Sequence, residues 1–222
     1  HAIMSFLLKD CEHPIKVSIL PRGEAALGFS QQKSVDKKLY TENYILSHIC
    51  VLLGGRCAEK IFYDELSSGA HDDIEKVTNL ITHYYKDWGM SSEYGPLNFN
   101  ELKINDKRLD NDIIEKVKNL EKITINTLEL YKNDVENLAK KLLEKETIDY
   151  TDIIETLDES LENTLSIKIW KLKIKNIFYY IIMVNRCSIC KKKLPLITIT
   201  CKCDSKLMFC SKHLHDHNCK HD

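Results

Sequence analysis

The carboxyl-terminal segment of this 222-residue chain carries a dense group of side chains that bind soft metal ions. Cysteine and histidine recur there as Cys-x-x-Cys, Cys-x-Cys, Cys-x-x-His and His-x-Cys. Thiolates and imidazoles at such spacings are typical of tetrahedral structural Zn²⁺ sites, and eight ligands suffice for two ions. So short a segment buries little apolar area, so bound metal would supply much of its folding free energy. The candidate ligands are Cys187, Cys190, Cys201, Cys203, Cys210, His213, His217 and Cys219.

Disulfide bonding is the alternative for these cysteines, since six thiols can pair in many ways. The interleaved histidines favour metal, however, and nothing in the sequence indicates secretion into an oxidising compartment. The sequence therefore predicts zinc in the tail. The other three cysteines, Cys11, Cys50 and Cys57, are predicted to be ordinary buried thiols.

Two further positions have side chains that bind metals, but residue type alone does not make them ligands. A histidine at position 1 is usually a frayed terminus. The pair Asp72-Asp73 stands where a helix is expected to begin, and acidic residues are common there as caps.

The composition bounds the class of protein. The apolar fraction of 43% is ordinary for a globular domain, and the net charge of −1 gives no argument for a nucleic-acid partner. No apolar run approaches the roughly 18 residues of a membrane-spanning helix, and the first residues do not resemble a signal peptide. All seven glycines lie between Gly23 and Gly95, which separates a front zone from a charged, helical middle.

Hydrophobic periodicity predicts a mainly helical domain with a small β-hairpin. Residues 1–9 are expected to form a helix, and residues 15–20 a strand that returns as a second strand from Leu27. A helix is expected from Thr41, and the pair Gly54-Gly55 within it indicates either close backbone packing or a kink. Further helices are predicted over residues 67–88, 110–145 and 149–157, with residues 91–100 as a loop.

Six segments resemble, in order and approximate spacing, the peptidase domain of FtsH-type ATP-dependent zinc metalloproteases. They are HAIMSFLL, VSILPRG, LGFSQ, LLGGRCAEKIFYDELSSGAHDDIEKVT, WGMSSEYGPLNF and LLEKETID. The segment GAHDDIEKVT is most similar to the mitochondrial, matrix-facing (m-AAA) members. The resemblance covers residues 1–158.

The resemblance implies a zinc site built from an H-E-x-G-H helix and a distant aspartate. By resemblance His1 is the second histidine and Asp73 the third ligand, while the first histidine and the glutamate base would stand before His1. The chain by itself is then expected to lack peptidase activity. Gly28 and Phe29 match the strand that pairs with extended substrate in this family.

The resemblance also implies features of a longer protein. These are an ATPase module that uses ATP and Mg²⁺, a membrane anchor before it, a homo- or hetero-hexamer, and unfolded or misassembled membrane proteins as substrates. No G-x-x-x-x-G-K-[ST] occurs in this sequence. The implied location is the mitochondrial inner membrane, or a mitochondrion-derived organelle.

The tail resembles an AN-one-type zinc finger, whose ligands interleave. That resemblance implies one site from Cys187, Cys190, Cys210 and His213, and another from Cys201, Cys203, His217 and Cys219. The spacing around the second site departs from the pattern, so His215 is an alternative to His217.

The expected domains are a truncated peptidase domain over residues 1–158, a linker or spacer over 159–182, and the finger over 183–222. Fingers of this type usually belong to cytoplasmic ubiquitin–proteasome or stress adaptors. Because the composition changes there and Met183 stands just where the finger begins, our hypothesis is that two reading frames are joined, with a genuine fusion as the alternative. The competing function is a non-catalytic zinc-finger adaptor.

Overall fold

The chain divides into two compact units, His1–Ile167 and Lys168–Asp222. The computed structural model describes residues 1–21, 28–33, 39–103, 106–157, 162, 164–165, 199–200 and 208–209. In the second unit, the described residues are the antiparallel strands β4 (Ile199–Thr200) and β5 (Met208–Phe209). All eight predicted tail ligands lie outside the described residues, so the zinc finger stays a prediction.

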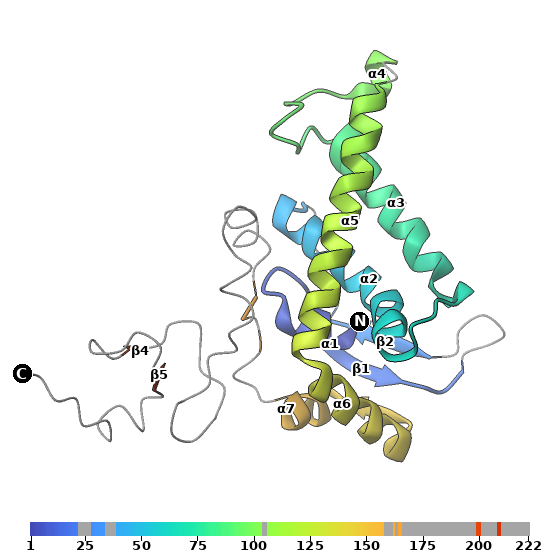
Figure 1. Ribbon diagram of the computed structural model, residues 1–222, viewed down its shortest axis with the longest axis vertical. Coiled ribbons are helices and arrows are strands. Elements are labelled where there is room, and N and C mark those ends of the chain that lie inside the picture. The colour runs from blue at the N-terminus through green and yellow to red at the C-terminus, as the bar shows by residue number, and fades with distance from the viewer. Residues whose placement is uncertain are drawn as a thin grey trace, which may run out of the picture. The chain divides into compact units, whose positions relative to one another are not determined.

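Helices dominate the described part of the first unit, as the periodicity predicted. Figure 1 shows the long helix α5 crossing α2, with α3 beside them and α6 and α7 at the end where the sheet lies. The helices are α1 (Ala2–Leu7), α2 (Glu42–Tyr63), the 3₁₀ turn η1 (Ser68–Ala70), α3 (His71–Lys86), α4 (Phe99–Leu102), α5 (Lys107–Leu130), α6 (Lys132–Lys145) and α7 (Tyr150–Leu157).

The helix boundaries follow from local capping. The side chain of Thr41 accepts a hydrogen bond from the backbone N–H of Tyr44 and so begins α2. Asp106 caps α5 in the same way through Arg108 N–H. The helix predicted over residues 110–145 is two helices that meet at Tyr131, and the short α4 lies partly within the predicted loop.

The core surrounds α2, which is buried around much of its circumference. Helix α1 is buried at all six positions, and its side chains Met4 and Phe6 have no exposed surface. Burying one side chain of this size stabilises the fold by about 1.5–3 kcal/mol. The short α1 therefore stays helical because it is packed on all sides, not because of its own length.

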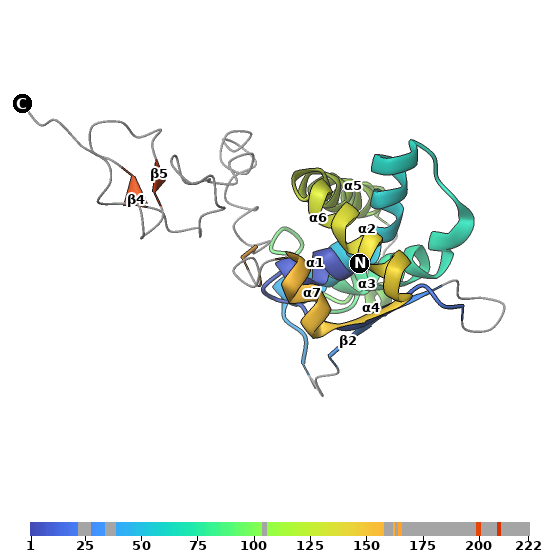
Figure 2. The same ribbon diagram turned by 90° about the horizontal axis from the view of Figure 1, so that it is seen from below.

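The sheet has three antiparallel strands in the order β2-β1-β3. Strands β1 (Pro14–Ser18) and β2 (Phe29–Gln32) form the predicted hairpin, while β3 (Thr147–Asp149) was not predicted. The hydroxyl groups of Ser18 and Thr147 lie 2.7 Å apart and add a side-chain hydrogen bond between β1 and β3. Within the described residues β2 is therefore an edge strand, as Figure 2 also shows from below.

The three cysteines of the first unit are buried and in no disulfide within the described residues, which confirms their prediction as ordinary buried thiols. Burial raises the pKa of Cys50 to about 12, and burial also raises that of Cys57 to about 12. Both thiols point at backbone carbonyls of α5, those of Leu120 and Glu121. Protonated thiols of this kind are weak nucleophiles and act as small apolar side chains.

One charge network joins α6 to α7. Lys145 Nζ lies 2.6 Å and Lys141 Nζ 3.1 Å from Asp152 Oδ1, and Lys141 also bonds Glu155. Hydrogen bonds from Lys145 and then Lys141 lower the pKa of the Asp152 carboxyl to about 2. The ionised carboxylate is thus favoured by the folded state.

Replacing Asp152 by Asn should therefore destabilise the protein in a pH-dependent way. An aspartate with a lowered folded pKa stabilises the fold fully above its unfolded pKa of about 4, and loses that contribution as the pH falls toward about 2. We expect the wild type to have the higher free energy of unfolding at pH 6, and the difference from Asp152→Asn to vanish near pH 2. Urea unfolding at several pH values measures this difference in free energy of unfolding, with Glu136→Gln on α6 as the control. A pH-independent difference would contradict the assignment.

Candidate metal centre

His1 stands at the start of α1 with its ring against α2. Its Nδ1 lies 2.8 Å from the carbonyl oxygen of Val51. A carbonyl only accepts, so Nδ1 is the protonated donor, and Nε2 of the neutral ring carries the lone pair. A backbone carbonyl on one ring nitrogen is the usual way in which a metal-binding histidine is oriented.

Two glycines of α2 leave the space in which His1 lies. A Cβ on Gly55 would stand 2.6 Å from His1 Nε2, and a Cβ on Gly54 would stand 3.0 Å from the backbone nitrogen of His1. No side chain other than hydrogen fits at position 55 without moving the ring. The helix continues unbroken through both glycines, so the prediction of close packing is confirmed and the alternative of a kink is not needed.

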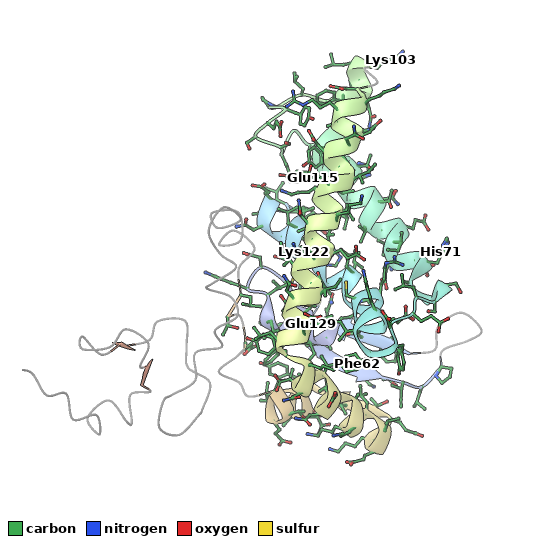
Figure 3. All side chains as sticks on the ribbon, in the orientation of Figure 1. Phe62, His71, Lys103, Glu115, Lys122 and Glu129 are labelled. Atoms are coloured by element: carbon green, nitrogen blue, oxygen red, sulfur yellow. The ribbon has the colours of Figure 1, made fainter. Side chains whose placement is uncertain are left out.

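Asp73 lies in the first turn of α3, next to the His1 ring. The segment before this helix is tied to α2, because Glu59 accepts hydrogen bonds from the hydroxyl of Ser67 at 2.5 Å and from its N–H at 3.3 Å. Ser67 in turn accepts from the N–H of Gly69 and begins η1. We call these contacts the Glu59–Ser67 clasp. Figure 3 marks His71, at which α3 starts.

The two predicted ligands meet. His1 Nε2 and Asp73 Oδ2 are 3.3 Å apart, and their side chains are 34% and 24% exposed. Two ligand atoms held about 2.0–2.2 Å from one tetrahedral zinc ion lie about 3.3–3.6 Å from each other. A direct N–H···O hydrogen bond usually spans about 2.7–3.2 Å. The separation of the pair matches that of two ligands of one zinc ion, and it also lies within the range of a direct His–Asp ion pair.

A third ligand is not found among the described residues. No group of three His, Cys, Asp or Glu side chains is arranged to hold a metal ion in that part of the chain. His71 is exposed, and His83 lies 2.5 Å from Asp87 of its own helical region. Among the described residues, the two predicted ligands His1 and Asp73 thus lie together without a third ligand.

His48 lies on α2 two turns before Gly55 and stacks on Tyr44, with ring centroids 5.7 Å apart. Burial lowers the pKa of His48, while the nearby carboxylates of Glu12 and Asp73 act in the opposite direction. Burial thus favours the neutral imidazole of His48, which packs on the ring of Tyr44.

The strand predicted to pair with substrate is β2, which lies at one edge of the three-stranded sheet. Phe29 begins β2 and pairs with Ser18 at the end of β1. A Cβ on Gly28 would stand 2.7 Å from the carbonyl oxygen of Ser18, so only glycine allows this approach of the two chains. The outer edge of β2 has no neighbouring strand in the described part of the first unit. A sheet edge of this kind can accept an extended peptide by backbone hydrogen bonding.

Two supporting groups were not predicted from the sequence: the carbonyl of Val51 and the carboxylate of Glu59. The carbonyl carries no sequence signal. The Glu59–Ser67 clasp joins positions eight residues apart across a helix end, a pattern that periodicity does not reveal. The glycine pair was the one visible signal of the ring's position.

Across the described residues, no helix has the length and hydropathy to cross a bilayer.

A family profile and several known proteins match the first unit of this chain. The profile of peptidase family M41 matches residues 1–156. An ATP-dependent zinc metalloprotease FtsH of Marinobacter nauticus is 31% identical over 180 residues, covering 72% of this chain and 28% of its own length. The mitochondrial ATP-dependent zinc metalloprotease FTSH 3 of rice is 32% identical, covering 74% of this chain and 22% of its own length.

A third relative is the mouse mitochondrial inner membrane m-AAA protease component AFG3L2, which is 31% identical over 169 residues. It covers 71% of this chain, while the chain covers 21% of that protein. The chain thus spans about a quarter of the length of these relatives. The matched region includes His1, Asp73 and the sheet, and on this basis the chain belongs to peptidase family M41.

Proposed function

We propose that this chain forms part of a zinc endopeptidase site in which His1 and Asp73 are two protein ligands. The observation that carries the proposal is the 3.3 Å separation of His1 Nε2 and Asp73 Oδ2. The protonated Nδ1 directed at Val51 supports it, because it leaves Nε2 free to bind. A bound zinc ion would polarise a peptide carbonyl and activate a water molecule.

The residues of the chain have separate tasks in this proposal. Val51 and Gly55 hold the His1 ring, and the Glu59–Ser67 clasp holds the start of α3 and so Asp73. The edge of β2, with Gly28 and Phe29, would bind an extended substrate chain next to the metal. We propose that a further histidine ligand and a glutamate base come from residues outside these 222, so that this chain alone lacks peptidase activity.

The whole protein is proposed to be an ATP-dependent protease. The names of the relatives support ATP dependence and zinc, and two of them are mitochondrial proteins. We propose a homo- or hetero-hexamer with an ATPase module that uses ATP and Mg²⁺, acting on unfolded or misassembled membrane proteins at the mitochondrial inner membrane. A membrane anchor would lie outside this chain.

The second candidate function belongs to the tail. Its eight cysteine and histidine residues fit two structural zinc ions, and such a finger would recruit a protein partner. The predicted boundaries at 158 and 183, and the hypothesis of two joined reading frames, remain proposals; if the finger is a separate protein, it would be cytoplasmic. The family match over residues 1–156 favours the peptidase reading for the first unit.

The assignment of Asp73 can be tested against its neighbour Asp72. We expect Asp73→Asn to raise the Zn²⁺ dissociation constant measured at the His1 ring by at least about tenfold, since it removes a ligand. Asp72→Asn is the matched control, because Asp72 is exposed in the same helical turn and is expected to leave the constant unchanged. Zinc titration followed through the ring resonances of His1 gives both values. Equal effects of the two variants would refute the assignment.

The space left by Gly55 gives an independent test. In Gly55→Ala the new Cβ must displace the His1 ring, so zinc binding should weaken by about tenfold or more, a loss typical of disturbed ligand support. The melting temperature should not fall in parallel, because alanine favours a helix over glycine by about 1 kcal/mol. Ser47→Ala is the control on α2, since its buried hydroxyl has no hydrogen-bond partner. Unchanged zinc binding in Gly55→Ala would show that the ring position is not needed.

The metal content of the tail is a third prediction. After purification in zinc, we expect about two ions per chain beyond any at His1, as eight ligands require. Cys190→Ser should remove about one of them, whereas Cys57→Ser should remove none, because Cys57 is a buried thiol against α5. Elemental analysis measures the ions. Zinc-free protein with its tail cysteines oxidised would support the disulfide alternative instead.

A further inference from the structure

A short segment of the first unit that follows α7 contacts the end of α1. Its described residues are Glu162, Thr164 and Leu165, which lie beyond the region matched by the family profile, residues 1–156. We call these three residues the strap. The sequence had predicted a linker here, so the contacts need an explanation of their own.

The backbone of the strap binds the carboxyl end of α1. The N–H of Leu165 donates to the carbonyl of Leu7 at 2.9 Å, and the N–H of Lys9 donates to the carbonyl of Leu165 at 2.8 Å. These two bonds form a parallel bridge between Leu8 and Leu165. Leu7 is the last residue of α1, and the final carbonyls of a helix have no partner within it. The strap therefore caps the helix that begins at His1.

Side chains fasten the strap to three other elements. Glu162 Oε1 accepts a hydrogen bond from the hydroxyl of Tyr150 at 2.7 Å and lies 3.0 Å from Nδ1 of His13. The Glu162 side chain is only 18% exposed. Thr164 hydrogen-bonds the side chain of Tyr131, where α5 meets α6. The strap is thus anchored to the segment before β1, to α7 and to the α5–α6 junction.

We propose that the strap is a positioning element for the metal centre. It holds the carboxyl-terminal end of α1 and thereby fixes the His1 ring relative to Asp73. Helix α1 has six residues, so it is about 9 Å long and acts as one rigid body. Val51 and Gly55 fix its amino-terminal end, and Leu165 fixes its carboxyl-terminal end. A helix held at one end alone can tilt, and a small tilt moves His1 Nε2 off the position that a shared zinc ion requires.

The positioning role of the strap rests on the proposed zinc function. The variants below distinguish a failure of the positioning role from a failure of zinc binding itself. Glu162→Ala removes the anchor to Tyr150 and His13, and Leu165→Pro removes the N–H that binds Leu7. The control is Glu129→Gln, an exposed position on α5 that Figure 3 labels. All variants are made in the full chain, and each is measured by amide hydrogen exchange, zinc titration and thermal melting.

In Glu162→Ala and Leu165→Pro we expect the amide of Lys9 to exchange about tenfold faster or more, because a strap that has lost one of its anchors holds the Leu165 carbonyl, the acceptor of Lys9 N–H, less firmly. The amide of Ser5, which donates to His1, should also exchange faster. Zinc binding at His1 should weaken about five- to tenfold, at the lower end of the loss seen when ligand support is removed. The melting temperature should change little, since the strap covers the end of one short helix. Glu129→Gln should match the wild type throughout.

Unchanged exchange at Lys9 in Leu165→Pro would overturn the strap itself. Faster exchange with unchanged zinc binding would overturn its positioning role and leave a merely structural contact. If the wild type shows no zinc binding that depends on His1 and Asp73, the proposed function fails instead. In that case faster exchange at both Lys9 and Ser5 would still support one part of the proposal, namely that the strap stabilises α1 as far as its amino-terminal end.

Discussion

The close approach of His1 to α2 is the constraint on which the candidate site depends. The imidazole lies where a side chain of residue 55 would otherwise be, and its Nδ1 is bonded to a carbonyl in the preceding turn of the same helix. Two glycines in a helix interior cost up to about 2 kcal/mol relative to alanine. That cost is offset because α2 is buried against α1, α3 and α5, so its helical state depends on packing more than on propensity.

How far the sequence predicts this arrangement depends on the range of each interaction. Apolar periodicity and local caps predicted α2, α3, α5 and the hairpin, because these signals lie within a few residues of each other. The pair Gly54-Gly55 indicated close packing, but the partner that packs there is over fifty residues away and leaves no mark on periodicity.

The elements that were missed exist through tertiary contacts. Strand β3 has three residues in a sequence rich in charged helix formers, and it is a strand because Ile148 is buried and pairs with Val17 of β1. The strap similarly depends on backbone groups of α1 that any residue could offer. The pairing of His1 with Asp73 was expected from family resemblance alone, since a terminal histidine and a helix-capping aspartate carry no signal of a shared metal by themselves.

Both candidate ligands stand in the first turns of separate helices, and each helix is located by residues that do not touch the metal. Helix α3 is held at its start by the Glu59–Ser67 clasp. Helix α1 is held at its amino-terminal end by α2 and at its carboxyl-terminal end by the strap. A ligand separation that must be correct to a few tenths of an ångström is thus fixed by contacts from residue 51 to residue 165. Because no single element carries both ligands, the geometry exists only in the folded unit, and zinc affinity should report on the integrity of these supports more sensitively than overall stability does.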